Sequence, residues 1–381
     1  MKNITNKLAV ALLLLFFAAC HHAPQASSET RLQQDSNLMR HAGNVIVTQT
    51  DYGYAVDVRS PWDTLAMLGH FAFVPDSLKV AVPEGRTVIR TPVQSVVSFS
   101  ATQWSVFLQL EEIDRVKCIL DGRYVHNAQM KVLLEEGKVI DVGNEAGADV
   151  EKILRIHPDV ILYSPYFDGF QKSLELTGAV LFPFADYLET TPLGRAEWIR
   201  IVGLLTCRET STDAWFNEIE RRYETLKKVC DSVAYRPLVF SDKPFNGQWY
   251  VAGGRSYIAQ LFADAGADYV WKDDASTASF PLDAETILSK AQHAEFWRIT
   301  NSSTLPLTYE QLGSENTIHP LFDAFKNRKV IVCDVQPTGY FEQSQCEPDL
   351  LLADFIHFFH PECLQGEWEG YSPKYYHWLE Q

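Results

Sequence analysis

The sequence predicts an α/β fold of two Rossmann-like lobes with mostly parallel sheets, joined by a single long backbone helix and preceded by a β-rich extension. Two observations point to this fold. Short apolar runs alternate with helical patterns on both sides of one long helical segment, which is typical of parallel sheets covered on both faces. The chain of 381 residues is 46% hydrophobic, which is enough to fill two cores.

The first residues indicate a secretory signal. Lys2 and Lys7 precede an apolar run at residues 8–17, and this run of about ten residues is half the length that an α-helix needs to cross a bilayer. We therefore expect residues 1–19 to be removed as a signal peptide.

Ala18 and Ala19 precede Cys20, and this pattern resembles the lipobox of bacterial lipoproteins. The resemblance implies that Cys20 is diacylated and carries the lipid anchor. Two acyl chains are what stable anchoring requires. An ordinary signal peptide cut nearby is the alternative interpretation of Cys20. Residues 20–43 are expected to be a tether, since the chain after Cys20 is polar. The mature protein is then a membrane-anchored lipoprotein of the periplasm or the cell surface.

Residues 44–92 show no helical period and predict the β-rich extension, as a hairpin or small sheet added to the first lobe. Its β-rich stretches lie at residues 45–48, 54–58 and 87–89.

Residues 93–191 are predicted to form the N-terminal lobe, because short buried runs alternate there with helical patterns. The first helix is indicated by Trp104, Phe107, Leu108 and Glu111, which recur at helical offsets. The predicted strands are 96–99, 116–120, 160–163 and 179–184, and the predicted helices are 101–111, 129–136, 150–156 and 170–176.

Residues 192–234 are predicted to connect the lobes as almost continuous helix, at 196–205 and 210–233. Apolar residues recur in the second stretch at spacings of four and three, so that one apolar stripe runs along it. We expect this stripe to lie across both lobes and the stiff helix to allow only a small closure. The stripe consists of Ile219, Tyr223, Leu226, Cys230 and Val233.

Residues 235–381 are predicted to form the C-terminal lobe, in which the alternation restarts after Pro237. The predicted strands are 238–240, 296–299 and 329–335, a further short segment lies at 267–271, and the predicted helices are 256–265, 283–291, 320–325 and 348–359.

The net charge of −16 and the lack of a basic stripe disfavour nucleic-acid binding, because an acidic protein repels phosphate backbones. Six cysteines follow Cys20 without the spacings that mark zinc or redox sites. Disulfides and buried free thiols both remain open. Cys346 and Cys363 are the pair to check, and Cys207 and Cys230 lie in one helical region where they are not expected to meet.

Four segments, in order and separated by one helical connector, resemble a known family. They are the strand, loop and helix at 96–116, the helix and Pro-Asp-strand at 148–162, the helix at 253–273 and the helix at 280–291. Together they resemble the class III periplasmic substrate-binding proteins of ABC importers for iron-siderophores, haem and cobalamin.

The resemblance implies that the chain captures an iron complex, either a siderophore or haem, or cobalamin, in an interlobe cleft. It implies delivery to an ABC permease and ATPase complex, no enzymatic activity, and no cofactor beyond the bound metal chelate. We expect a monomer held at the membrane by its N-terminal lipid.

The resemblance also implies that Glu151 and Glu285 dock the two lobes on the permease, as one exposed glutamate in each lobe. Both lie in the first turn of a predicted helix, where the helix dipole stabilises a carboxylate by about 0.3–1 kcal/mol. A purely local role in the helix is therefore the alternative.

Aromatic residues and cations in the loops at the strand ends are the ligand-binding candidates, because aromatic walls suit a large ring-shaped ligand and arginine suits an anionic chelate. Trp249, Arg255 and Tyr257 are favoured, since Gly253 and Gly254 can bring the backbone close to a ligand at a helix start. Packing within a lobe is the alternative for each aromatic residue. The full set is Trp104, Tyr124, Tyr166, Trp249, Tyr250, Arg255, Tyr257, Trp271 and Tyr340.

Two other classes of function stay open. One is an enzyme on the same fold that acts on a metal chelate, and the other is a surface or interaction lipoprotein without a small ligand. His357 and His360 are three residues apart on the last predicted helix, but no metal-binding motif accompanies them, so no metal site is expected.

Overall fold

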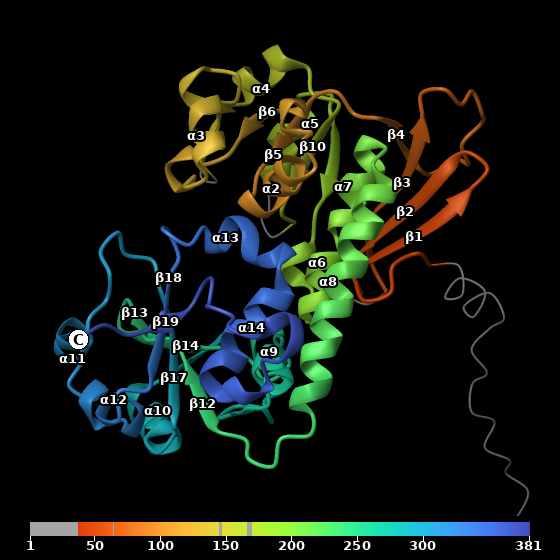
Figure 1. Cartoon of the computed structure of the whole chain (residues 1–381). Coiled ribbons are helices and arrows are strands. Elements are labelled where there is room, and N and C mark those ends of the chain that lie inside the picture. Colours follow the sequence, from red (N-terminus) through yellow and green to blue (C-terminus); the bar gives the residue numbers. More distant parts are fainter. Residues whose placement is uncertain (1–36, 64, 145–146, 166–169) are drawn as a thin grey trace, which may run out of the picture. The chain divides into compact units, whose positions relative to one another are not determined.

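The structure, a computed structural model, describes residues 37–63, 65–144, 147–165 and 170–381. Residues 38–381 form one compact unit that contains two α/β lobes and a long helix, α8 (Glu209–Cys230), which runs past both (Figure 1). The predicted fold class is thereby confirmed, whereas the exact domain boundaries stay a prediction. Among the described residues, no helix is long and apolar enough to cross a membrane.

The β-rich extension is a four-stranded sheet. One face packs on the main core through Phe71 and Phe73, and the other face has its own small cluster around Ala72 and Val74. Gly53 adopts φ 123° at the first turn, and a Cβ there would lie 2.3 Å from the carbonyl oxygen of Phe73. The strands are β1 (Val45–Thr50), β2 (Gly53–Arg59), β3 (Met67–Pro75) and β4 (Thr87–Thr91), of which β3 was not predicted.

The packed chain begins at Leu38, inside the segment expected to be a tether. The buried carboxylate of Glu197 accepts hydrogen bonds from the backbone amides of residues 40–42 at 2.7–3.0 Å. Glu189 accepts two more from residues 43–44. These bonds hold residues 40–44 against the connecting helices.

The N-terminal lobe is built on a five-stranded parallel sheet in the order β11-β10-β5-β6-β7. Ser100 caps the first helix and forms a capping box with Gln103, and Asp149 caps α4. The predictions hold to within two residues at most ends. The strands are β5 (Val96–Ser98), β6 (Val116–Ile119), β7 (Ile140–Asp141), β10 (Val160–Tyr163) and β11 (Val180–Pro183), and the helices are α2 (Ala101–Gln109), α3 (Ala128–Glu135), α4 (Val150–Ile156) and α5 (Phe170–Glu175).

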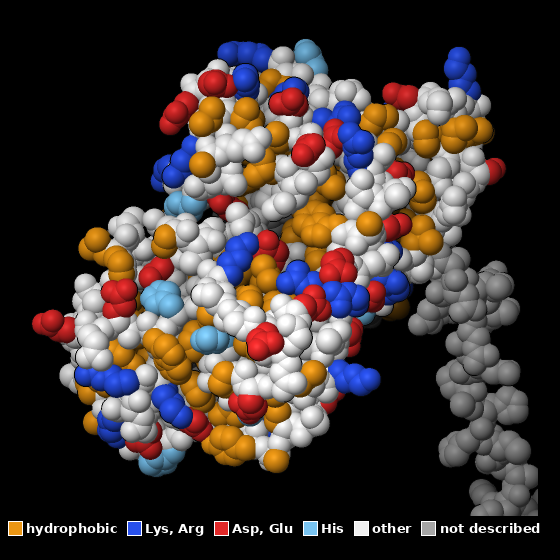
Figure 2. Space-filling model, in the orientation of Figure 1, with side chains coloured by type: hydrophobic (Ala, Val, Ile, Leu, Met, Phe, Trp, Pro, Cys, Tyr) orange, Lys and Arg blue, Asp and Glu red, His pale blue; other side chains and the backbone are white. Residues whose placement is uncertain are grey.

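Three helices connect the lobes: α6 (Pro192–Glu197), α7 (Ile199–Thr206) and α8. Cys207 ends α7 with a left-handed backbone at φ 56°, which places the break between the two predicted helical stretches. The predicted stripe on α8 is buried from Ile219 to Cys230 and packs on α7 and on α14 (Pro348–Phe359). Figure 2 shows acidic and basic side chains gathered over α8 on its solvent side.

The C-terminal lobe has a second five-stranded sheet in the order β15-β12-β17-β18-β19, parallel except for the last strand. The strands are β12 (Leu238–Ser241), β15 (Asp268–Tyr269), β17 (Phe296–Asn301), β18 (Val330–Asp334) and β19 (His377–Trp378). The helices are α9 (Tyr257–Asp264), α10 (Ala284–Ala291), α11 (Tyr309–Glu315), α12 (Asp323–Lys326), α13 (Tyr340–Gln343) and α14, of which α11 and α13 were not predicted.

A small antiparallel sheet of β13 (Pro244–Phe245), β14 (Gln248–Val251) and β16 (Phe280–Leu282) replaces the loop expected around Trp249. Asn246 and Gly247 form its two-residue turn with φ 51° and 79°. Asn-Gly is the strongest short-range signal for such a hairpin, so this element was readable from the sequence.

All six cysteines in the described part of the chain are free. The pair expected to be worth checking, Cys346 and Cys363, is not bonded. Burial raises the pKa of the thiols of Cys363 and of Cys230 on α8.

Candidate ligand-binding cleft

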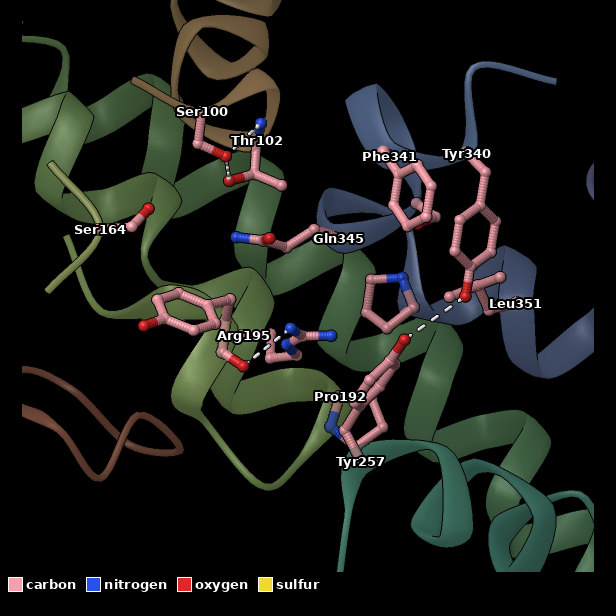
Figure 3. A pocket seen from close by; sticks show the side chains of 13 residues that line it. Ser100, Thr102, Ser164, Pro192, Arg195, Tyr257, Tyr340, Phe341, Gln345 and Leu351 are labelled. Carbon is pink, nitrogen blue, oxygen red and sulfur yellow. Dashed lines mark hydrogen bonds between the residues drawn. The ribbon is translucent and has the colours of Figure 1, made fainter. Parts of the chain in front are cut away.

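A cavity of about 510 Å³ lies between the two lobes, lined by loops that follow strands of the N-terminal lobe and by helix starts of the connector and the C-terminal lobe (Figure 3). Ser100 and Ser164 follow β5 and β10, at the edge of a parallel sheet where ligands usually bind. Hydroxyl, amide and aromatic groups dominate the wall. The lining residues are Ser100, Thr102, Ser164, Tyr187, Pro192, Arg195, Tyr257, Tyr340, Phe341, Ser344, Gln345, Pro348 and Leu351.

Arg195 is the one charged side chain among the described residues that line this cavity. It projects from α6, donates a hydrogen bond of 2.8 Å to the carbonyl oxygen of Tyr187, and stacks at 3.9 Å over the ring of Tyr257. Its Nε is buried without a hydrogen-bond partner, and no carboxylate of the described residues forms an ion pair with it. The cavity therefore offers a ligand a cation that has no direct ion pair, with the buried carboxyl group of Asp186 nearby.

Tyr257 and Tyr340 meet at the back of the cavity, with their hydroxyl oxygens 3.4 Å apart (Figure 3). Burial alone raises the pKa of Tyr257, but the charges of Arg195 and Arg298 outweigh burial and hold its pKa below the ordinary value. Burial raises the pKa of Tyr340, which keeps that hydroxyl protonated. The two arginines thus create a positive field at this phenol pair.

Asp186 lies beneath the cavity, fully buried after β11. Thr102 donates to one of its oxygens at 2.9 Å, and Gln345 of the C-terminal lobe donates to the same oxygen. Burial raises the pKa of Asp186, although Arg195, Gln345 and Thr102 all oppose this rise. This carboxyl group joins the two lobes at the floor of the cleft.

A second contact across the lobes involves Glu342 on α13. Its buried carboxylate accepts hydrogen bonds from the backbone amides of His126 and Asn127, at 2.6 and 3.2 Å. Helix α13 also packs against α2 of the N-terminal lobe. The C-terminal lobe therefore closes one side of the cleft through α13.

A second cavity, of about 550 Å³, lies at the carboxyl ends of β12 and β17. It shares three wall residues, Tyr257, Tyr340 and Phe341, with the first cavity. Its remaining lining residues are Asp242, Lys243, Pro244, Phe245, Tyr250, Ala252, Ile258, Ser279, Arg298, Thr300, Asn301, Ser302 and Ser303.

Three of the predicted ligand residues line these cavities. Tyr257 and Tyr340 line both, and Tyr250 lines the second. Tyr124 is 64% exposed on the short helical turn after β6, and Tyr166 lies outside the described residues.

The three predicted tryptophans are buried in the core and line neither cavity. Trp104 points from α2 into the main cluster, and Trp271 packs edge-on against Tyr269. Trp249 stacks on Trp297 at 5.9 Å and is 1% exposed. It lies on strand β14, where successive side chains face opposite sides, so its neighbour Tyr250 faces the cavity instead.

Arg255 is exposed and lines neither cavity. The two glycines before it lie close to other backbone segments. A Cβ on Gly253 would lie 2.1 Å from the carbonyl oxygen of Ser276, and a Cβ on Gly254 would lie 2.4 Å from that of Trp271. These glycines are required because the backbone packs against the loop that follows β15.

Sequence reasoning did not single out Arg195 as a ligand residue. Thr191 caps α6 and Pro192 stands at its first position, and this pair marks a helix that starts directly after the last loop of the N-terminal lobe. That signal places Arg195 in a first helical turn near the cleft, but it does not say which way the side chain points.

Glu151 and Glu285 occupy equivalent positions in the two lobes. Each lies in the first turn of its helix, α4 or α10, and each helix is capped by an aspartate two residues earlier. Both glutamates are exposed, and the carboxylate of Glu151 lies 3.7 Å from Arg155. They are therefore accessible to a partner.

The described residues contain no group of three His, Cys, Asp or Glu side chains placed to hold a metal ion. His360 is buried, and its Nε2 lies 3.0 Å from the carbonyl oxygen of Gly266.

Most of this chain is similar in sequence to known proteins. A family model described as "Periplasmic binding protein" matches residues 96–337. An uncharacterized lipoprotein of Methanocaldococcus jannaschii is 28% identical over 314 residues, which cover 79% of this chain and 73% of the relative.

Solved structures share the fold. An ABC transporter substrate-binding protein from Listeria monocytogenes has a TM-score of 0.55 at 17% identity, over 70% of this chain and 99% of that one. A periplasmic haem-binding protein from Pseudomonas aeruginosa has a TM-score of 0.55 at 16% identity, over 71% of this chain and 93% of that one.

Proposed function

Because this chain belongs to the periplasmic binding protein family, we propose that it is the substrate-binding lipoprotein of an ABC importer that captures an iron complex, either a siderophore or haem, or cobalamin. The observation that carries the proposal is the cavity between the lobes, in which Arg195, without a direct ion pair, lies among aromatic and hydroxyl groups. Its volume of about 510 Å³ lies in the range of small-molecule sites. Haem and many ferric chelates present carboxylates or other anionic oxygens that an arginine binds.

Anchoring through Cys20 is part of the proposal. Its support is the lipobox-like sequence before Cys20 and the relative named as a lipoprotein. Cys20 itself lies outside the described residues.

Docking on the permease through Glu151 and Glu285 is also part of the proposal. Their equivalent first-turn positions in the two lobes support it, because charge pairs at such places set the orientation and rate of association. The transporter then opens the lobes and releases the ligand.

Titration of the purified, unacylated protein with haemin, cyanocobalamin and a panel of ferric siderophores tests the ligand, read by tryptophan fluorescence and calorimetry. We expect one probe to bind with one-to-one stoichiometry at micromolar affinity or better. Arg195→Gln should weaken that binding at least tenfold, because a hydrogen bond to a charged group contributes about 1.5–3 kcal/mol. Arg255→Gln removes an equal charge outside both cavities and should change nothing.

Failure of every probe to saturate the protein would contradict the proposal and favour an interaction lipoprotein without a small ligand. Chemical turnover of a bound chelate would favour an enzyme. If Arg195→Gln and Arg255→Gln bind the probe with the same affinity, the ligand does not bind at Arg195.

A further inference from the structure

The two cavities are neighbouring compartments of one cleft. The aromatic side chains of Tyr257, Tyr340 and Phe341 form the wall between them and line both. Each compartment has a volume of roughly 500 Å³, which is the size of a complete small-molecule site. A ligand that fills only one of them leaves the other open.

The compartments differ in charge. In the first, Arg195 is the one charged side chain among the described lining residues, and no carboxylate of the described residues forms an ion pair with it, so an anionic ligand group complements it. In the second, every described cation is already paired. Arg298 forms an ion pair with Asp242 at 2.8 Å, and Lys243 forms one with Glu315 at 2.6 Å. The second compartment therefore has no free charge to offer.

The second compartment offers a ligand uncharged hydrogen-bonding groups and the faces of aromatic rings. Its polar lining beyond the ion pairs consists of hydroxyl and amide groups at Ser279 and residues 300–303. Three aromatic rings beside them are unusually open, with Phe245 69%, Tyr250 46% and Phe341 58% exposed. Large apolar groups exposed around a polar hollow mark a binding surface, and such rings pack on flat or aliphatic ligand faces.

We propose that one ligand spans both compartments, with an anionic group bound by Arg195 and a neutral arm rich in amides or hydroxyls in the compartment of Phe245 and Tyr250. This inference rests on the proposed function and deepens it. The ligand class becomes an anionic metal chelate that carries a long neutral arm, rather than a compact chelate.

The test compares two variants across four probes. Haemin is anionic without an amide arm, ferrichrome is a neutral peptide chelate, cyanocobalamin carries amide arms without net charge, and ferric pyoverdine joins an anionic chelate to a peptide arm. We expect pyoverdine to bind best among them. Arg195→Gln and the double variant Phe245→Ala/Tyr250→Ala should each weaken it at least tenfold, with additive effects because they act on separate parts of the ligand.

Trp62→Ala is the matched control, because it removes an aromatic side chain that is 59% exposed outside both cavities. Unfolding temperatures of all variants show whether folding is preserved. Hydrogen exchange of the wild-type protein adds a readout without mutation: the best-bound probe should protect the segments 192–197 and 298–303 together.

The outcomes separate the two proposals. If a probe binds and Arg195→Gln weakens it, but the ring variant and the protection of 298–303 show no effect for any probe, the two-compartment inference is wrong while the proposed function stands. If no probe binds the wild-type protein, the proposed function fails and this inference fails with it.

Discussion

At the scale of single residues, Asp349 is a buried acid whose ionisation opposes folding. It lies in the first turn of α14, 2% exposed, with Arg222 at 3.1 Å. Burial raises its pKa from 3.8 to about 6, although Arg222 opposes the rise. The folded state therefore holds the proton more tightly than the unfolded chain, and stability is lost as the pH rises from about 4 through 6.

Asp349→Asn removes this titration. Relative to the variant, the wild-type protein should lose about 3 kcal/mol of unfolding free energy between pH 4 and pH 7, because each pKa unit corresponds to about 1.4 kcal/mol. Urea unfolding of both proteins at four pH values measures this difference. Glu369→Gln, which changes an exposed acid, should track the wild type, and a pH-independent difference for Asp349→Asn would show that its pKa is not raised.

Trp249 and Tyr250 show what can be predicted about single side chains from the sequence and what cannot. The sequence identified both as candidate ligand aromatics, and its Asn-Gly pair contained the signal for a hairpin. On a strand the two side chains must face opposite sides, so only one of them can line a cavity. Which one does so depends on which face of β14 packs against Trp297 and Phe322, and that is a tertiary contact.

At the scale of elements, α7 and α8 pack closely because Gly203 faces Thr212. A Cβ on Gly203 would lie 2.1 Å from Oγ1 and 2.8 Å from Cγ2 of Thr212, and Thr212 is fully buried. The two helices can approach in this way only while position 203 has no side chain.

Gly203→Ala should therefore destabilise the protein by about 1–3 kcal/mol through overpacking, although alanine favours a helix over glycine. Unfolding of Gly203→Ala, Thr212→Ala and the double variant measures the coupling. The double variant should be more stable than the sum of the single effects, because the two clashing Thr212 atoms are gone. A Gly203→Ala variant as stable as the wild type would show that the helices part without cost.

The positions of the helices and strands were more predictable than the directions of single side chains. The ends of α4, β10 and α14 agree with prediction, because capping residues and proline mark them locally. Two of the elements that escaped prediction, β3 and α13, were set by packing. Strand β3 is buried on both faces in its second half, and α13 is a single turn held between α2 and the C-terminal lobe.

At the scale of the whole molecule, the two lobes meet through Gln345 with Asp186 and through Glu342 with residues 126–127, beside the rigid α8. These contacts lie on the side of the cleft that α13 closes. They join the two lobes on that side of the cleft.

The docking proposal is tested at the same scale. Glu151→Ala with Glu285→Ala should reduce transport of the bound probe into proteoliposomes roughly tenfold, because two charge pairs with the permease are lost. Ligand affinity and unfolding temperature should not change, since both side chains are exposed. Glu310→Ala removes another exposed first-turn glutamate, on α11, and should transport normally. Uptake at the wild-type rate in the double variant would refute docking through these residues.

The alternation of strands and helices, the apolar stripe of α8 and the two first-turn glutamates could be predicted from local sequence, because each depends on neighbours within a few turns of chain. The residues that line the cleft could not. Arg195 rather than Arg255 faces it, and Tyr250 rather than Trp249, because its walls come from loops and helix starts far apart in the chain. Their side chains take their directions from how two sheets and three connecting helices pack, and no local pattern records that packing.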